Sequence, residues 1–245
     1  MPTVSRMWPW TALRAAPSIV TAMQRPEEIL ANLTAVERRI VAACDRSARR
    51  REEITLVAVT KTFPAVAVDA AIAAGATDIG ENRVQEARDK KPAVAGAARW
   101  HLIGHLQSNK AKDAVRLFDA IHSIDSGELA ERVGRAAGSA GKRQDVLIEV
   151  NIGREPQKAG IDPAEVSRVA AAIQRIDSLS LLGLMTIPPI GEAEAIRPYF
   201  RELRKIKEAL GLAHLSMGMT DDFEVAIEEG ATIIRVGRAI FGSRG

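Results

Sequence analysis

One lysine stands where its amine could do covalent chemistry. Lys61 directly follows residues 54–60, an apolar and β-branched run that predicts a strand buried on both faces. Phe63 and Pro64 end this run, and residues 65–75 predict a helix. Ligands of parallel α/β folds bind at the carboxyl ends of strands, where a readily deprotonated lysine can form a Schiff base with an aldehyde. The alternative reading is a solvated lysine at a strand end.

A second group of residues could bind phosphate. Ser216 and Gly218 precede a predicted helix at 220–230, and Gly237 opens a short predicted helix near 238–242. Backbone N–H groups at the start of a helix bind phosphate. The alternative is that both glycines only serve tight turns.

The elements that must position these residues alternate regularly. Eight predicted strands, each followed by a helix, indicate a parallel sheet, and eight is the count of a closed (β/α)₈ TIM barrel. An open doubly wound sheet is the alternative, but the first strand is followed by Lys-Thr-Phe-Pro and by no G-x-G-x-x-G fingerprint. We therefore predict one barrel domain. The strands are predicted at 54–60, 76–80, 99–103, 119–124, 145–151, 180–186, 213–217 and 232–236, and the helices at 65–75, 82–91, 107–117, 126–140, 163–175, 192–210, 220–230 and 238–242.

The first part of the chain divides at about residue 24. Residues 1–24 are basic, acid-free and broken by prolines, and we interpret them as a disordered extension or as the result of a start assigned too early, with a transit peptide as the weaker alternative. A helix is predicted from Pro26 to about Arg50, with apolar residues at helical spacing on one face. We expect Cys44, beside that face, to be a packed and inert thiol. The barrel domain is assigned to residues 25–245.

Composition excludes several classes of protein. Of 245 residues, 47% are hydrophobic and 27% are charged, as in ordinary globular proteins. Without Arg6 and Arg14 the chain has 32 basic and 31 acidic residues, so no nucleic-acid partner is expected. No apolar run is long enough to span a membrane. The single cysteine indicates a reducing compartment, and we expect a cytoplasmic protein. Without a sufficient set of metal ligands, we expect no metal site.

The two candidate sites belong together in a closed barrel. Its eighth strand adjoins the first, so Lys61 and the phosphate-binding loops are neighbours, and this pairing fits pyridoxal 5′-phosphate, which has both an aldehyde and a phosphate. Arg235 lies on the eighth strand. An arginine facing the pyridine nitrogen cannot accept a proton, so that nitrogen would stay unprotonated. The alternative for Arg235 is a salt bridge to an acid at the end of the barrel.

Five motifs in order give the chain a specific resemblance. They are VTKTFP (59–64), GENRVQE (80–86), WHLIGHLQSNK (100–110), LSMGMTDD (215–222) and IRVGRAIFG (234–242). Residues 26–245 closely resemble the YggS/PROSC family of pyridoxal-phosphate-binding proteins, also called PLP homeostasis proteins. This family looks like the N-terminal barrel of alanine racemase standing alone.

The resemblance implies a set of cofactor contacts. Lys61 is expected to carry the Schiff base, Ser216, Gly237 and Arg238 to bind the phosphate, Arg235 to face the pyridine nitrogen, and Asn82 to lie beside the cofactor. Two positions depart from the family. Arg238 replaces a threonine of many members, so its phosphate contact is either through the backbone alone or gains a charge. Phe63 replaces a second lysine of some members, which argues against a transfer of the cofactor between lysines there.

Three functions compete at this point. The first is a monomeric or weakly dimeric protein that binds pyridoxal phosphate, buffers it and delivers it to PLP-dependent apo-enzymes, without strong turnover. The alternative is an amino-acid racemase of the alanine racemase type, which needs two bases. Lys61 could be one of them, but Tyr199 is the single tyrosine and lies in a predicted outer helix, and the chain ends at Gly245 with no second domain to cover the pocket. The third is a Schiff-base aldolase acting on a sugar phosphate.

Overall fold

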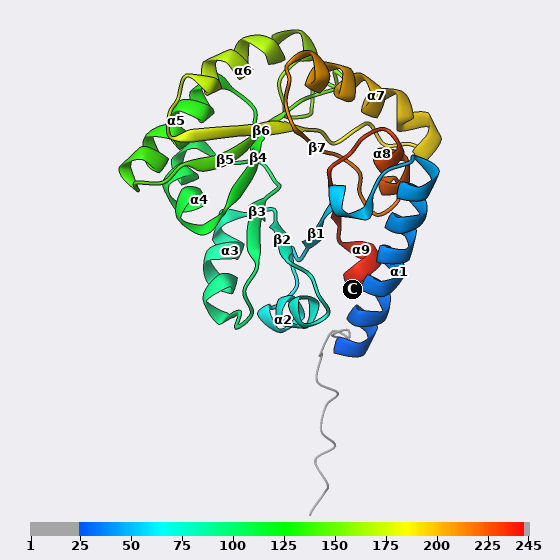
Figure 1. Cartoon of the computed structure of the whole chain (residues 1–245). Coiled ribbons are helices and arrows are strands. Elements are labelled where there is room, and N and C mark those ends of the chain that lie inside the picture. Colours follow the sequence, from blue (N-terminus) through cyan, green and yellow to red (C-terminus); the bar gives the residue numbers. More distant parts are fainter. Residues whose placement is uncertain (1–24, 243–245) are drawn as a thin grey trace, which may run out of the picture.

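Eight parallel strands close into a barrel in their order along the chain (Figure 1). The computed structural model describes residues 25–242. The closing pair is β1 (Thr55–Val59) with β8 (Ile233–Val236), where Val57 is in register with Arg235. This architecture confirms the predicted (β/α)₈ TIM barrel and the single barrel domain. The other strands are β2 (Asp78–Glu81), β3 (Arg99–Leu102), β4 (Ala120–Ile124), β5 (Gln144–Glu149), β6 (Leu179–Met185) and β7 (His214–Ser216).

Helices cover the outside of the ring. Each predicted helix is present, although α4 begins at Ala111 after a 3₁₀ turn at Ser108–Lys110 rather than at residue 107. Within residues 25–242, no helix is long and apolar enough to cross a membrane. The helices after the strands are α2 (Ala65–Ala73), α3 (Val84–Lys90), α4 (Ala111–Leu117), α5 (Gly127–Ser139), α6 (Val166–Gln174), α7 (Ala193–Ala209), α8 (Phe223–Glu228) and α9 (Arg238–Phe241).

One further helix precedes the barrel. The helix α1 (Pro26–Arg46) packs beside α8 and α9, as Figure 1 shows, and ends four residues before the predicted limit. Its predicted apolar face is buried, and ion pairs from Arg39 to Glu224 and from Arg46 to Glu228 hold its polar side to α8. Cys44 is buried, and this burial raises the pKa of its thiol, as expected for an inert packed cysteine. The predicted extension, residues 1–24, lies outside the described residues.

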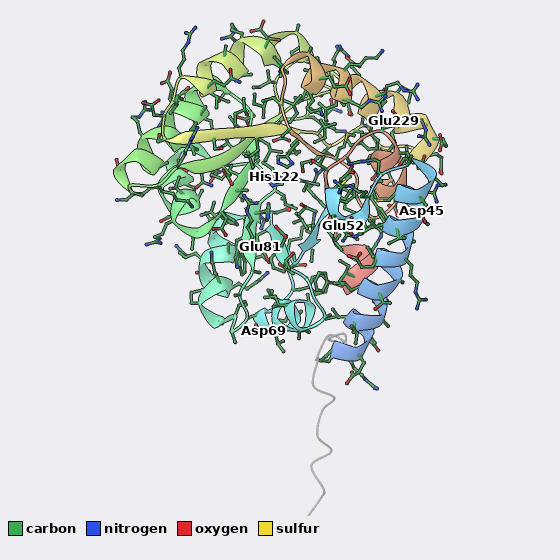
Figure 2. All side chains as sticks on the ribbon, in the orientation of Figure 1. Asp45, Glu52, Asp69, Glu81, His122 and Glu229 are labelled. Atoms are coloured by element: carbon green, nitrogen blue, oxygen red, sulfur yellow. The ribbon has the colours of Figure 1, made fainter. Side chains whose placement is uncertain are left out.

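Alternating strand residues divide the molecule into two layers. One set points outward into a large apolar layer beneath the helices, and the other points into the barrel. The inward set includes a small cluster of buried apolar residues, Val57, Leu147, Met185 and Ile233. The remaining inward positions are largely polar, and Figure 2 shows His122 near the centre of the molecule. The interior therefore carries the groups that can do chemistry.

Candidate cofactor site

Lys61 lies on a tight loop at the carboxyl end of β1 and is partly buried. The next residue, Thr62, has a φ of 69°, in the left-handed region that non-glycine residues seldom adopt. Two hydrogen bonds fix this turn. The backbone N–H of Phe63 donates to the carbonyl of Thr60 at 3.0 Å, and the backbone N–H of Thr62 donates to the carboxylate of Glu86. The backbone of the loop that carries Lys61 is thus fixed by hydrogen bonds.

A buried ion pair lies behind that loop. The ammonium of Lys90 donates to Glu81 Oε1 at 2.6 Å, to Glu86 Oε1 at 3.0 Å and to the carbonyl of Thr60 at 2.8 Å. The hydroxyl of Thr60 also donates to Glu81 Oε1, at 2.6 Å. Burial raises the pKa of Glu81, although Lys90 and Thr60 oppose this. Figure 2 shows Glu81 between the strands and α3. Through these hydrogen bonds, Lys90 and Glu86 of α3 hold the loop that carries Lys61 in place.

The start of α9 offers backbone donors beside β1. The N–H groups of Ile240 and Phe241 both donate to the carbonyl of Gly237 at 2.9 Å, so α9 begins there. The N–H groups that open a helix have no acceptor within that helix. A Cβ on Gly237 would lie 3.2 Å from the carbonyl oxygen of Val59, which places this end of α9 directly against β1. The guanidinium of Arg238 points elsewhere and pairs with the exposed carboxylate of Asp221.

Arg235 lies fully inside the barrel. Its guanidinium donates to Ser216 Oγ at 2.7 Å and to the carbonyl of Thr186 at 2.9 Å. Among residues 25–242, no carboxylate lies within 4 Å of it, so the salt-bridge alternative for Arg235 is wrong for the described part of the chain. Burial lowers its pKa to about 10, with partial compensation from Asp222 and Glu149, so it remains protonated at neutral pH.

A chain of hydrogen bonds runs from Arg235 through the barrel. Ser216 Oγ lies 2.9 Å from His122 Nδ1, and His122 Nε2 lies 2.9 Å from His101 Nδ1. His101 Nε2 ends the chain 2.8 Å from Asp78 Oδ1. His122 is fully buried, and this burial holds its pKa well below 6.5, so its ring is neutral at pH 7.

Two ends favour one direction for this chain, because the guanidinium of Arg235 can only donate and the carboxylate of Asp78 can only accept. Ser216 Oγ accepts from Arg235, and its own hydroxyl proton is then directed to His122 Nδ1. His122 consequently carries its proton on Nε2 and donates to His101, which donates to Asp78. We infer these proton positions from the pattern of donors and acceptors. The hydroxyl of Ser216 is thereby committed within the protein.

Two further predicted positions, Asn82 and Gly218, lie in loops at the ends of strands. Asn82 follows β2 and is half-buried, and a Cβ on Gly104 would lie only 2.4 Å from its carbonyl oxygen, so the backbones of these two loops touch. Gly218 has a φ of 94°, and a Cβ there would lie 2.6 Å from the Cβ of Ala226. The turn and its packing on α8 therefore require a glycine at position 218.

One titratable group at the barrel mouth was not predicted as a site residue. Glu149 ends β5, is only 8% exposed, and has an oxygen, Oε2, with no hydrogen-bond partner among the described residues. Burial and the nearby Asp125 raise its pKa to about 6, against the opposing effect of Arg235 and His105. Its signal in the sequence was an acid at the carboxyl end of a predicted strand, directly after the apolar residues Val146, Leu147 and Ile148.

The structure brings the predicted residues to one end of the barrel. Lys61, Asn82, Gly237 and Arg238 follow the carboxyl ends of β1, β2 and β8, and Ser216 meets Arg235 within the ring. His101 and His105 do not form a pair, because His105 contacts Asp125 at 3.2 Å instead. Among residues 25–242, no three histidine, cysteine or acidic side chains are grouped so that they could hold a metal ion.

Comparison with known proteins first defines the class of barrel. Residues 31–245 match the family model described as "Alanine racemase, N-terminal domain". The solved structure of an alanine racemase from Clostridium difficile 630 is similar, with a TM-score of 0.68, 15% identity and coverage of 89% of this chain and 57% of that one. That similarity shows the fold alone.

Closer relatives define the family within that class. The pyridoxal phosphate homeostasis protein of Aquifex aeolicus is 42% identical over 220 residues, covering 86% of this chain and 96% of that protein. The protein of the same name from Escherichia coli K12 is 42% identical over 230 residues, covering 89% and 97%. The structure of PipY from Synechococcus elongatus with PLP bound has a TM-score of 0.77 and 38% identity, covering 87% and 100%. The chain belongs to the pyridoxal phosphate homeostasis protein family.

Proposed function

We propose that this protein binds pyridoxal 5′-phosphate at the mouth of its barrel, buffers it, and delivers it to PLP-dependent apo-enzymes. The observation that carries the proposal is the adjacency of β1 and β8. This pairing brings the end of β1, which the Lys61 loop follows, beside the start of α9. Family membership supports the same ligand, since relatives carry the name pyridoxal phosphate homeostasis protein and PipY has PLP bound.

The residues present fit the two reactive ends of this cofactor. Lys61 would hold the aldehyde, and the N–H groups at Gly237 and Arg238 would hold the phosphate. Because the Arg238 side chain pairs with Asp221, its phosphate contact would be through the backbone. A larger side chain at position 237 would come too close to Val59, and it would also occupy the space that the phosphate needs.

The other predicted residues would act on the ring. Asn82 would lie beside it, and Arg235 would face the pyridine nitrogen. The phosphate contact expected of Ser216 stays a prediction, and its hydroxyl lies 2.7 Å from Arg235 and 2.9 Å from His122. Bound pyridoxal phosphate supplies an aldehyde and an electron-withdrawing ring. A guanidinium that donates but cannot accept a proton keeps the ring nitrogen unprotonated, which limits the ring as an electron sink.

A racemase is the alternative, and the position of the tyrosine argues against it. Tyr199 lies on α7 and packs against the apolar layer outside the barrel, so it is not at the mouth. We therefore propose no strong catalytic turnover. A cytoplasmic location fits the one cysteine, which is held as a buried thiol.

The test is the absorption spectrum of the protein after incubation with pyridoxal phosphate and dialysis. The wild type should be yellow, and borohydride reduction followed by mass spectrometry should fix the added mass on Lys61. Lys61→Ala should lose the colour, while Lys112→Ala, on the exposed side of α4, should keep it. A colourless wild type would refute the proposal.

Delivery and catalysis need separate measurements. The loaded protein should reactivate an apo-aminotransferase in the presence of a scavenger that removes free pyridoxal phosphate. Chiral chromatography should show no racemisation of alanine beyond the slow rate of the free cofactor. Turnover of roughly 1–10³ per second would instead identify an enzyme.

A further inference from the structure

The side chain of Glu149 points into the barrel. It lies two residues after Leu147, which belongs to the inward apolar group, whereas Ile148 between them belongs to the outer layer. It is in register with Met185, another inward residue, at the carboxyl end of the neighbouring strand. The carboxyl group is therefore placed at the mouth, at the same end of the barrel as Lys61.

This carboxyl group lacks a donor. Glu149 Oε2 is buried and has no hydrogen-bond partner among the described residues, and an unsatisfied buried acceptor costs free energy. Arg235, a cation inside the barrel that acts on Glu149 electrostatically, donates instead to Ser216 and to the carbonyl of Thr186. A bound molecule that brings an N–H or O–H donor would satisfy the oxygen.

The position of β5 in the ring indicates what kind of molecule would bring this N–H or O–H donor to Glu149. In a ring of eight strands, β5 is four strands from β1 in either direction, so Glu149 and Lys61 come from opposite sides of the mouth. We propose that Glu149 binds the protonated primary amine of an incoming amino compound, a free amino acid or a lysine side chain, and takes a proton from it. This inference rests on the proposed function, because delivery of an aldehyde cofactor requires an amine to receive it.

The proton transfer balances. The ammonium R–NH₃⁺ and the carboxylate of Glu149 become R–NH₂ and the carboxylic acid, so two opposite charges are replaced by two neutral groups. The neutral amine then has the lone pair that addition to an aldehyde requires. Neutralisation of both partners is favoured where water is excluded.

The surrounding charges tune Glu149 as a proton acceptor. Asp125 after β4 raises the proton affinity of its carboxylate, while Arg235 on β8 and His105 after β3 lower it, and burial dominates all three. A pKa raised from 4.5 to about 6 makes the carboxylate about 30-fold more competent to hold a proton than an ordinary glutamate. The group still ionises below neutral pH, so it is available as a carboxylate.

The first experiment uses the protein without cofactor. Titration of the ¹³C-labelled Glu149 carboxyl by NMR, assigned with Glu149→Gln, should give a lower pKa in methylammonium chloride than in tetramethylammonium chloride, which has no N–H donor. Exposed Glu128 on α5 serves as the internal control. The same titration in both salts would overturn the proposal.

The second experiment uses the loaded protein. Glu149→Gln should bind pyridoxal phosphate as the wild type does, but methylamine should discharge it more slowly by about 10²-fold, the lower end of general acid–base effects. Glu128→Gln should behave as the wild type. Equal discharge rates in the variant and the wild type would overturn the proposal. It would also be overturned if Glu149→Gln failed to retain pyridoxal phosphate while methylammonium left the NMR titration unchanged, because Glu149 would then serve the cofactor's own hydroxyl. A wild type that never loads would refute the cofactor proposal, whereas the NMR result would stand.

Discussion

Replacement of Lys90 by methionine should weaken both the fold and the Lys61 loop. The side chain of Lys90 is only 7% exposed, and Glu81, its partner at 2.6 Å, is fully buried. Methionine fills a similar volume but removes the ammonium that donates to Glu81, to Glu86 and to the carbonyl of Thr60. One carboxylate is then left buried, with the Thr60 hydroxyl as its remaining recorded donor.

The cost follows from that uncompensated charge. Removing one partner of a buried ion pair costs about 3–5 kcal/mol, and at about 2–4 °C per kcal/mol for a domain of this size the unfolding temperature should fall by about 6–20 °C. Burial already raises the pKa of Glu81, and loss of Lys90 raises it further. A carboxyl with a raised folded-state pKa loses stability as the pH rises, so the deficit should be larger at pH 8 than at pH 5.

The assay is thermal unfolding of the cofactor-free protein at both pH values, with cofactor retention measured in parallel. Glu81→Gln with Lys90→Met should recover much of the loss, because no charge is left buried. Lys112→Met, on an exposed side of α4, should stay within about 0.5 kcal/mol of the wild type. A Lys90→Met protein as stable as this control would refute the reasoning.

Three further predictions concern the interior and the N-terminus. Arg235→Gln should change the absorption spectrum of the bound cofactor, and an unchanged spectrum would place Arg235 away from the ring. Because the pKa of Glu149 is about 6 in the folded protein against 4.5 ordinarily, its ionisation costs about 2 kcal/mol of stability as the pH rises through this interval. Glu149→Gln should gain that amount over the wild type at pH 8 and nothing at pH 4 in denaturant titrations, whereas parallel pH profiles would contradict it. Deletion of residues 2–24 should leave the unfolding temperature within error, and a large decrease would mean that the segment packs on the barrel.

The pattern of apolar runs was sufficient to predict the architecture. Each predicted strand overlaps an observed one, because every strand contributes apolar residues to the layer beneath the helices. The ends of the elements were predicted less accurately. The first helix stops at Arg46 instead of about Arg50, since Ala48 adopts a left-handed φ of 51°.

The interior contacts could not be predicted in the same way. The partner of His101 is His122, 21 residues later on the adjacent strand, and nothing in the linear sequence marks the two as partners. Which residues meet across two strands depends on their register, and a linear pattern does not give it. Glu149 was overlooked for a related reason, since an acid at the end of a strand has meaning only once its inward direction is known.

The polar interior explains how one cation can be kept inside the barrel without an ion pair. Arg235 donates to Ser216, and each later member of the chain donates onward until the carboxylate of Asp78 accepts, so every proton in the series is used. The partial charges along such a chain reinforce one another and stabilise the guanidinium. Asp222 and Glu149 favour the charged form of Arg235 electrostatically, while burial opposes it. A pyridine nitrogen facing this guanidinium would accept a hydrogen bond from it in its unprotonated form, which adds no second positive charge to the interior.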